Sequence, residues 1–410
     1  DNFATAAALG GTIIGGEGSD TITIDGGGAL AMAATFAFSG IEELDITAAN
    51  AAVSITGAQL AQNATLIIDG DAAADVFNVN TASTATAARS ADLSNVTIKT
   101  GATASITVTG NVGVDTITGG VASETFTQTI GADVYEGGAG TGVDTYVAVT
   151  NLTATGSSNA SVGSIVNLGT TAVTSADVIA NATSFISGSA TSVAGGTAAH
   201  LYAANVAGNS AEVDTLGGIE NVTGTAQIDY IVGSAEDNVL SGLAGADYID
   251  AGAGSDTVIG GNGIDTIALG LNDASIDYVS YFGIIAAANA NNVTQFEAGA
   301  GGDVIQFSDA SLTVDAGAFT AGTAVTFATV GTSSDTANQV IVDTIANLGA
   351  LGVTIGNDST NTVNVHQIAI ASDTGAIFWD ADGDWTAGSV QIGDLDITTG
   401  LTVDNVAIIA

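Results

Sequence analysis

Aspartate and asparagine recur at a fixed interval between residues 233 and 268. This stretch divides without a gap into four blocks of nine residues, GSAEDNVLS, GLAGADYID, AGAGSDTVI and GGNGIDTIA. The sixth position of each block carries a side-chain oxygen: Asn238, Asp247, Asp256 and Asp265. Hard divalent cations such as Ca²⁺ take six to eight oxygen ligands, so a row of such residues could hold a row of cations.

The eighth position of each block indicates how these oxygens are held in place. It is always a branched aliphatic residue: Leu240, Ile249, Val258 and Ile267. We interpret each block as a tight turn followed by a short strand, with the eighth residue pointing inward and two blocks forming one coil of a solenoid. Turns on the same edge then lie two blocks apart, which pairs Asn238 with Asp256 and Asp247 with Asp265.

Glycines complete the pattern, because they allow backbone angles with φ > 0 and leave turn carbonyls free to face a cation. The last block matches GGxGxDxUx at every position, the nonapeptide of calcium-binding parallel β-helices. The stretch therefore resembles the RTX family of secreted proteins, and this resemblance implies Ca²⁺ between stacked turns. Ordinary Gly/Asp turns, which need no metal, are the alternative, but they do not explain four blocks in tandem. The predicted glycine ligands of this main array (residues 233–270) are Gly245, Gly254, Gly261 and Gly263.

A second, less regular array occupies residues 110–147. Its blocks are GNVGVDTIT, GGVASETFT and QTIGADVYE, then a two-residue insertion, then AGTGVDTYV. The spacing pairs Asp115 with Asp133, and Glu124 with Asp144 across the insertion, so we expect calcium here as well. Near the start of the chain stands one isolated block, GGEGSDTIT. The further predicted metal ligands are Gly113, Gly131 and Gly142 in this first array, and Gly16, Gly18 and Asp20 in the isolated block.

The charge balance narrows the choice of partners. The chain has 43 acidic residues and two basic ones, Arg89 and Lys99, for a formal charge of −41. It has almost no cations to offer phosphates, which excludes nucleic acid as a partner. Repulsion between like charges opposes compaction, and divalent metal would relieve it. With 46% hydrophobic residues the chain can still bury a large core, and the absence of Cys excludes disulfides and thiolate metal sites.

These patterns predict an all-β fold: an elongated parallel β-solenoid or β-roll with Ca-binding nonapeptide repeats and a β-rich C-terminal cap. A short helical turn is expected at Ala58–Asn63, between strands. We divide the chain into five regions: 1–109, solenoid-like with the isolated repeat; 110–147, the first array; 148–232, a linking or insertion region without a block in register; 233–270, the main array; and 271–410, the cap with a secretion signal.

Catalysis is not predicted. His200 and His366 are isolated and neither belongs to an HExxH motif, and there is no GxSxG elbow. The well-defined carboxylate pairs all stand at repeat positions that calcium explains. Asp380, Asp382 and Asp384 are spaced like the start of an EF-hand loop, but Gln391 replaces its terminal Glu, so we favour a solvated turn.

No stretch reaches the roughly 18 apolar residues of a membrane span, and no basic segment of a cleavable signal peptide precedes the first strands. The RTX resemblance implies type I secretion through an uncleaved signal within residues 376–410. We therefore expect a secreted, calcium-dependent structural protein that assembles with copies of itself at the cell surface, as an S-layer or extracellular fibre subunit. Cell-surface polysaccharide is a second expected partner. The alternative function is the repeat-bearing portion of a larger RTX adhesin or exoenzyme.

Overall fold

The fold was analysed in a computed structural model of the chain. It describes residues 2–5, 11–24, 29–31, 37–47, 52–70, 75–80, 89–99, 105–111, 113–149, 163–174, 177, 192–200, 213–270, 275–281, 290–308, 326–328, 339–343, 368–371, 374–379, 390–397 and 400–409. The described residues divide into two compact units. Unit 1 comprises residues 1–160 and 196–222, and unit 2 comprises residues 161–195 and 223–410.

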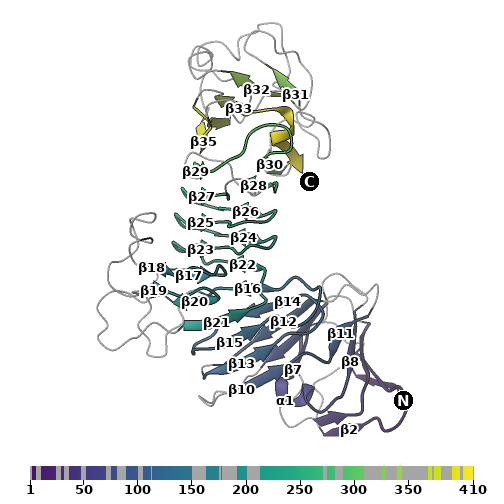
Figure 1. The fold of residues 1–410 in the computed structure, drawn as a ribbon. Coiled ribbons are helices and arrows are strands. Elements are labelled where there is room, and N and C mark those ends of the chain that lie inside the picture. The colour runs from purple at the N-terminus through teal and green to yellow at the C-terminus, as the bar shows by residue number, and fades with distance from the viewer. Residues whose placement is uncertain are drawn as a thin grey trace. The chain divides into compact units, whose positions relative to one another are not determined.

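Short strands make up nearly all of the regular structure in the described part of the chain (Figure 1). The helical exceptions include α1 (Gly57–Leu60) and the 3₁₀ turn η2 (Val403–Asn405). Thr56 caps α1 by accepting from the Gln59 amide, while the Gln59 side chain accepts from the Thr56 amide, a reciprocal pair that starts even a short helix. The predicted all-β, mostly parallel architecture is confirmed, and so is the helical turn near residue 58.

Unit 1 contains parallel sheets built from strands about one coil apart in sequence. One sheet has the order β1 (Asn2–Thr5), β3 (Thr21–Ile24), β6 (Glu43–Ile46), β8 (Leu66–Gly70) and β11 (Val96–Ile98), and β2 (Thr12–Ile14) pairs with β5 (Ala37–Ser39). A second runs β4 (Ala29–Ala31), β7 (Ala52–Thr56), β9 (Val76–Asn80), β12 (Ser105–Thr109), β14 (Glu124–Thr127), β16 (Thr145–Val147) and β22 (Asn221–Thr223). A third runs β10 (Arg89–Asp92), β13 (Asp115–Thr118), β15 (Val134–Glu136), β21 (Val213–Gly217) and β20 (Thr197–His200).

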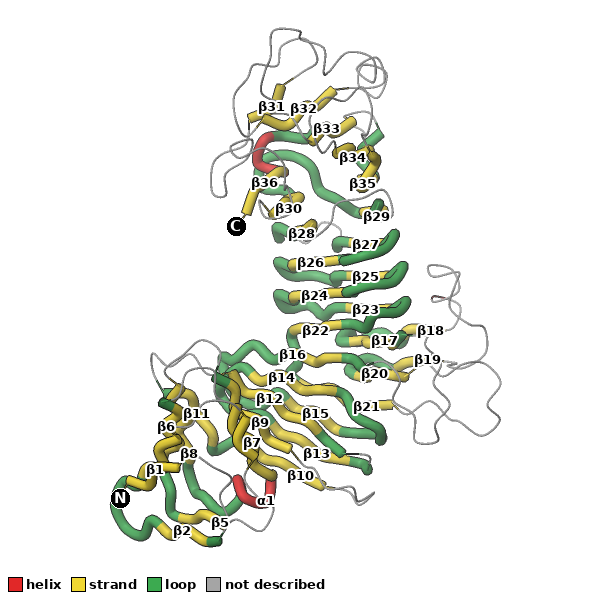
Figure 2. The backbone as a smooth tube through the Cα atoms, turned by 180° about the vertical axis from the view of Figure 1, so that it is seen from behind, coloured by secondary structure: helices red, strands yellow, loops and turns green. Residues whose placement is uncertain are grey.

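Unit 2 stacks its coils in two columns of strands, which alternate along the chain in both views (Figures 1 and 2). One column contains β24 (Val239–Ser241), β26 (Thr257–Ile259), β28 (Tyr278–Tyr281), β30 (Val304–Ser308) and β36 (Val406–Ile409). The other contains β17 (Ser164–Asn167), β23 (Tyr230–Val232), β25 (Tyr248–Asp250), β27 (Thr266–Ala268) and β29 (Asn291–Thr294). It continues through β35 (Val390–Leu395), β34 (Ala376–Trp379), β33 (Ile368–Ala371), β32 (Gln339–Asp343) and β31 (Thr326–Ala328), and a separate hairpin pairs β18 (Val173–Thr174) with β19 (Ser192–Val193).

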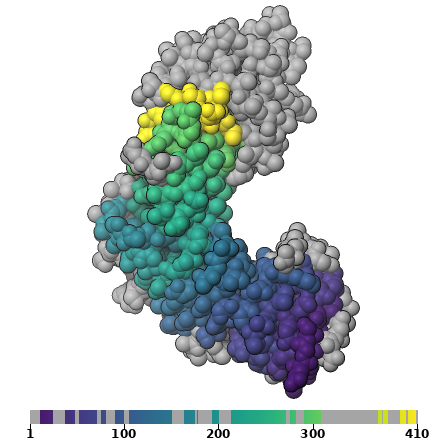
Figure 3. Space-filling view, turned by 45° about the vertical axis from the view of Figure 1, so that its right-hand side comes forward, coloured from purple at the N-terminus to yellow at the C-terminus, as the bar shows by residue number. Residues whose placement is uncertain are grey.

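The core of unit 2 follows the eighth positions of the blocks. Leu240 is in register with Val258, and Ile249 with Ile267, and all four side chains are fully buried. Each pair is separated by two blocks, as the coil interpretation requires. The C-terminal strands extend the same stack, because β35 pairs with β29 and β36 pairs with β30. In the space-filling view the yellow C-terminal residues accordingly pack against the green ones (Figure 3).

Aromatic side chains fill the corresponding core positions of the first array in unit 1. Phe126, Tyr135 and Tyr146 are fully buried. The Tyr135 and Tyr146 rings meet edge to face with centroids 5.5 Å apart, and the Phe126 and Tyr135 centroids are 6.0 Å apart. Tilted contacts of this kind stabilise a core beyond the area they bury. The degenerate array therefore keeps the coil geometry by exchanging aliphatic core residues for larger ones.

Candidate metal centre

The sixth-position side chains lie buried beneath the turns and form hydrogen-bonded ladders from coil to coil. On one edge of unit 2, here called edge one, the Asp229 amide donates to Asp247 Oδ1 at 2.8 Å, and the Asp247 amide donates to Asp265 Oδ1 at 3.0 Å. The Asp265 amide then donates to Asn291 Oδ1 at 3.1 Å. Each carboxylate thus accepts a hydrogen bond from the start of the strand in the preceding coil and fixes its position. The same hydrogen bond holds the carboxylate in a single orientation.

The opposite edge, edge two, repeats the arrangement. The Asn238 amide donates to Asp256 Oδ1 at 2.8 Å, and the Asp256 amide to Asp277 Oδ1 at 2.8 Å. The Asp277 amide donates to Asp303 Oδ1 at 3.0 Å. The predicted pairs Asn238/Asp256 and Asp247/Asp265 are therefore brought together, and each ladder continues beyond the main array.

Unit 1 contains the same ladders. The Asp115 amide donates to Asp133 Oδ1 at 2.7 Å, and the Glu124 amide donates to Asp144 Oδ1 at 2.7 Å. The two-residue insertion does not break the second pair. In the isolated block, the Asp20 amide donates to Glu42 Oε2 at 2.8 Å.

Several ladder members were not among the predicted residues: Glu42, Asp214, Glu220, Asp229, Asp277, Asn291 and Asp303. Glu220 and Asp229 could have been predicted from the sequence. Residues 215–223 and 224–232 continue the nine-residue register toward the N-terminus, with Glu220 and Asp229 at the sixth position. The prediction that region 148–232 contains no block in register is wrong for its last two blocks, because Glu220 and Asp229 join the ladders. Asp277 and Asp303 are separated from their partners by 21 and 26 residues, so strict periodicity misses them.

The glycines leave space directly against the carboxylates. A Cβ added to Gly224 would lie 2.8 Å from Asp229 Oδ2, and at Gly242 and Gly260 it would collide with Asp247 Oδ2 and Asp265 Oδ2. Gly245 and Gly263 have φ of +147° and +136°, and a Cβ on Gly263 would collide with the Gly245 carbonyl oxygen. The same left-handed backbone occurs at Gly16, Gly18, Gly131, Gly254 and Gly261, whereas Gly142 does not have a positive φ.

Unbalanced negative charge is the main electrostatic feature of these turns. Asp247 Oδ2, Asp265 Oδ2 and Glu124 Oε1 are buried without a hydrogen-bond partner. Burial raises the pKa of Asp247 to about 9, with the charge of Asp229 adding to the effect, and burial raises the pKa of Asp265 to about 6. Burial likewise raises the pKa of Glu124. A buried carboxylate with no partner is costly, and a bound cation would supply the missing charge.

The donor set fits a hard cation that is held largely by the backbone. Within the described residues, no group of three or more Asp, Glu, His or Cys side chains converges on one point. A site at these turns would therefore combine one or two carboxylate oxygens with carbonyl oxygens of the stacked turns. An oxygen-only set of this kind suits Ca²⁺, and the absence of Cys excludes thiolate ligands for softer metals.

A comparison with protein families agrees with this geometry. The family model of the RTX calcium-binding nonapeptide repeat, with four copies, matches residues 214–241 and 232–267. These residues are RTX-type repeats. No curated protein matches the chain. The matched region reaches back over the Glu220 and Asp229 blocks, so the RTX repeats begin earlier than residue 233. RTX repeats bind calcium, which supports Ca²⁺ as the metal, whereas the individual ligands remain predictions.

Outside the ladders, the described residues were compared with the requirements of a membrane-spanning helix. No helix in the described ranges is long and apolar enough to cross a membrane. Asp380, Asp382, Asp384 and His366 lie outside the described residues.

The raised carboxyl pKa values predict an unusual pH dependence for the metal-free protein. A carboxyl whose pKa is higher in the folded than in the unfolded state stabilises the fold below pH about 4 and loses that effect as the pH rises through the folded value. The pH window of this loss extends from about 4 to about 6 for Asp265 and from about 4 to about 9 for Asp247. In metal-free buffer the free energy of unfolding should thus increase as the pH is lowered from 9 to 5.

With saturating Ca²⁺ the trend should reverse, because protons compete with the metal for the same oxygens. Urea unfolding at pH 5, 7 and 9, with and without calcium, measures both slopes. Equal slopes in the two conditions would contradict the assignment of these carboxylates to the metal.

Proposed function

We propose that this chain is a secreted structural protein whose RTX repeats fold when they bind Ca²⁺ and whose folded copies assemble at the cell surface. The observation that carries the proposal is the ladder of buried carboxylates, with oxygens that have no partner at Asp247 and Asp265. Such a ladder is stable once cations neutralise it. RTX repeats are typical of secreted proteins, and a calcium-poor cytoplasm would keep the chain unfolded until export.

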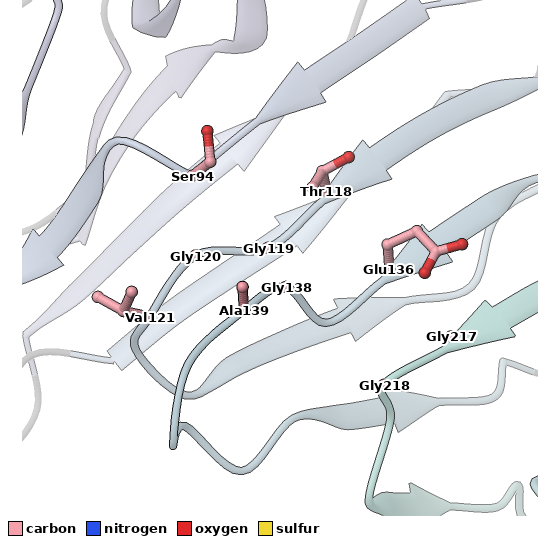
Figure 4. A pocket seen from close by; sticks show the side chains of 10 residues that line it. All are labelled: Ser94, Thr118, Gly119, Gly120, Val121, Glu136, Gly138, Ala139, Gly217 and Gly218. Atoms are coloured by element: carbon pink, nitrogen blue, oxygen red, sulfur yellow. The ribbon is translucent and has the colours of Figure 1, made fainter.

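One surface recess lies in unit 1. This recess of about 400 Å³ lies beside the two-residue insertion, Gly137–Gly138, and half of its lining residues are glycines. Glu136 and Thr118 project into its neighbourhood from adjacent strands (Figure 4). Glu136 is the only carboxylate in the lining, so the recess lacks the paired acids of a glycosidase.

Assembly of such an acidic protein requires cations between copies. In the described residues, the Lys99 ammonium is already bound to Glu43 at 2.7 Å and to Asp69 at 2.5 Å. This ammonium is thus not freely offered to a neighbouring copy, while the chain carries a formal charge of −41. Calcium bridges between acidic surfaces, and contacts to cell-surface polysaccharide, are therefore the proposed means of association.

Imaging the surface of the secreting cell with and without chelator tests this function. A regular lattice or fibre that disperses in chelator and returns with calcium is the expected result. Protein that stays dispersed in calcium, or that forms isolated projections, would contradict self-assembly and point to the repeat portion of a larger adhesin or exoenzyme. Light scattering by purified protein under the same cycle separates assembly from attachment to the cell.

A further inference from the structure

The row of turns along edge one, where cations would bind one above another as a cation column, has a distinct end. The residues of the last coil differ chemically from those of the coils before it. Three successive turns place a glycine five residues before the sixth-position carboxylate: Gly224 before Asp229, Gly242 before Asp247, and Gly260 before Asp265. At each of these glycines an added Cβ would lie against the Oδ2 atom of that carboxylate. The glycine therefore leaves open the space beside the oxygen that a cation would use.

The register of the strands shows which residue takes the glycine's place in the next coil. Strand β26 pairs with β28 through Thr257↔Tyr278 and Val258↔Val279. Two residues further along, Gly260 is level with Tyr281. The fourth coil of this edge thus carries a phenol where the three coils below it have no side chain.

The sixth position changes in the same coil. The Asp265 amide donates to Asn291 Oδ1, the contact that Asp265 itself accepts from Asp247 one coil below. Asn291 keeps the ladder hydrogen bond, but its amide is neutral. This coil therefore has lost both the open space and the charge that distinguish the Asp229, Asp247 and Asp265 turns.

Tyr281 is held in this place by its surroundings. Its side chain is 8% exposed, and its ring stacks on Phe307 with centroids 5.4 Å apart. A Cβ on Gly393 of β35 would lie 2.5 Å from the Tyr281 hydroxyl, so the closing strand packs directly over that oxygen. The hydroxyl is buried without a hydrogen-bond partner, as is Asp265 Oδ2.

We propose that Tyr281, together with Asn291, closes the cation column of edge one, so that Asp265 is its last carboxylate and no cation binds in the Tyr281 coil. The phenol occupies the space beside the turn, and its oxygen lies against Gly393 of the closing strand. Strand β35 can then pair with β29 on a neutral surface instead of on a further row of charge. This inference rests on the proposed calcium binding of the repeats.

The test is the calcium stoichiometry of the full chain, measured by equilibrium dialysis and metal analysis, with circular dichroism to confirm folding. The double variant Tyr281→Gly/Asn291→Asp restores the glycine and the carboxylate, and it should bind about one more Ca²⁺ than the wild type. Tyr281→Phe keeps the ring and should bind the same number as the wild type. A folded double variant with unchanged stoichiometry, or a gain with Tyr281→Phe, would overturn the proposal.

Asn291→Asp alone keeps the test decisive if the double variant does not fold. This variant adds a carboxylate while the Tyr281 ring still fills the space beside it. It should therefore bind no additional calcium and should unfold more readily than the wild type. A gain of one ion in this variant would show that Tyr281 does not close the column. If the wild type itself binds no calcium, the proposed function fails first, and that result is distinguishable from all of these.

Discussion

Removal of calcium from the folded chain is expected to unfold its repeat arrays and to disperse its assemblies. A ligand that binds only the folded state stabilises it by about 2.7 kcal/mol per site at a hundredfold excess over Kd, so several sites together exceed the stability of a typical domain. Without metal, the buried carboxyls of Asp247 and Asp265 on edge one must be protonated or must carry a charge that no bound cation neutralises. The β-type circular dichroism signal should therefore fall in EGTA and return when calcium is restored.

Magnesium is the matched control for this experiment. Mg²⁺ carries the same charge but requires near-octahedral geometry at shorter distances and gives up its water reluctantly. If charge screening alone maintained the fold, Mg²⁺ would restore the signal as well as Ca²⁺ does. Folded, assembled protein that persists unchanged in EGTA would show that the metal is incidental and that packing alone maintains the solenoid.

Substitution of both main carboxylates of edge one should have opposite effects with and without calcium. Asp247→Asn/Asp265→Asn retains side-chain oxygens for the amides of Asp229 and Asp247 but removes two buried titratable carboxyls. In calcium, the variant should bind fewer ions and unfold at lower urea concentration than the wild type. In metal-free buffer at neutral pH it should be the more stable protein, by on the order of several kcal/mol, because burial raises the pKa values of these two carboxyls to about 9 and about 6 and one pKa unit corresponds to about 1.4 kcal/mol.

The control variant is Asp177→Asn/Asp404→Asn, which removes the same charge from exposed positions of the same unit outside the repeats. It should leave the calcium stoichiometry unchanged. It should change the free energy of unfolding by no more than a few tenths of a kcal/mol, with or without calcium. Calorimetric titration and urea unfolding measure both quantities. Unchanged calcium uptake by Asp247→Asn/Asp265→Asn would mean that these carboxylates are the wrong ligands.

Periodicity alone was sufficient to predict the coils and much of the ladder. The eighth positions Leu240, Ile249, Val258 and Ile267 had to face inward, because a strand alternates its faces and a coil of two blocks superimposes them. The pairing of Asp247 with Asp265 follows from the same count. Glu124 and Asp144 also meet across their insertion, since the two extra residues are accommodated outside the paired strands.

The tertiary structure decided what lies beyond the repeats. Asp277, Asp303 and Asn291 join the ladders at spacings of 21 and 26 residues, because an insertion can leave the coil while its strand keeps its place in the sheet. Tyr281 has no signature in the sequence, and only the register of β26 and β28 places it level with Gly260. The period of the sequence determines which residues occupy equivalent positions in the repeats, because each turn is formed by residues that are adjacent along the chain. The end of a column is decided by strand pairing, which joins residues that are distant along the chain.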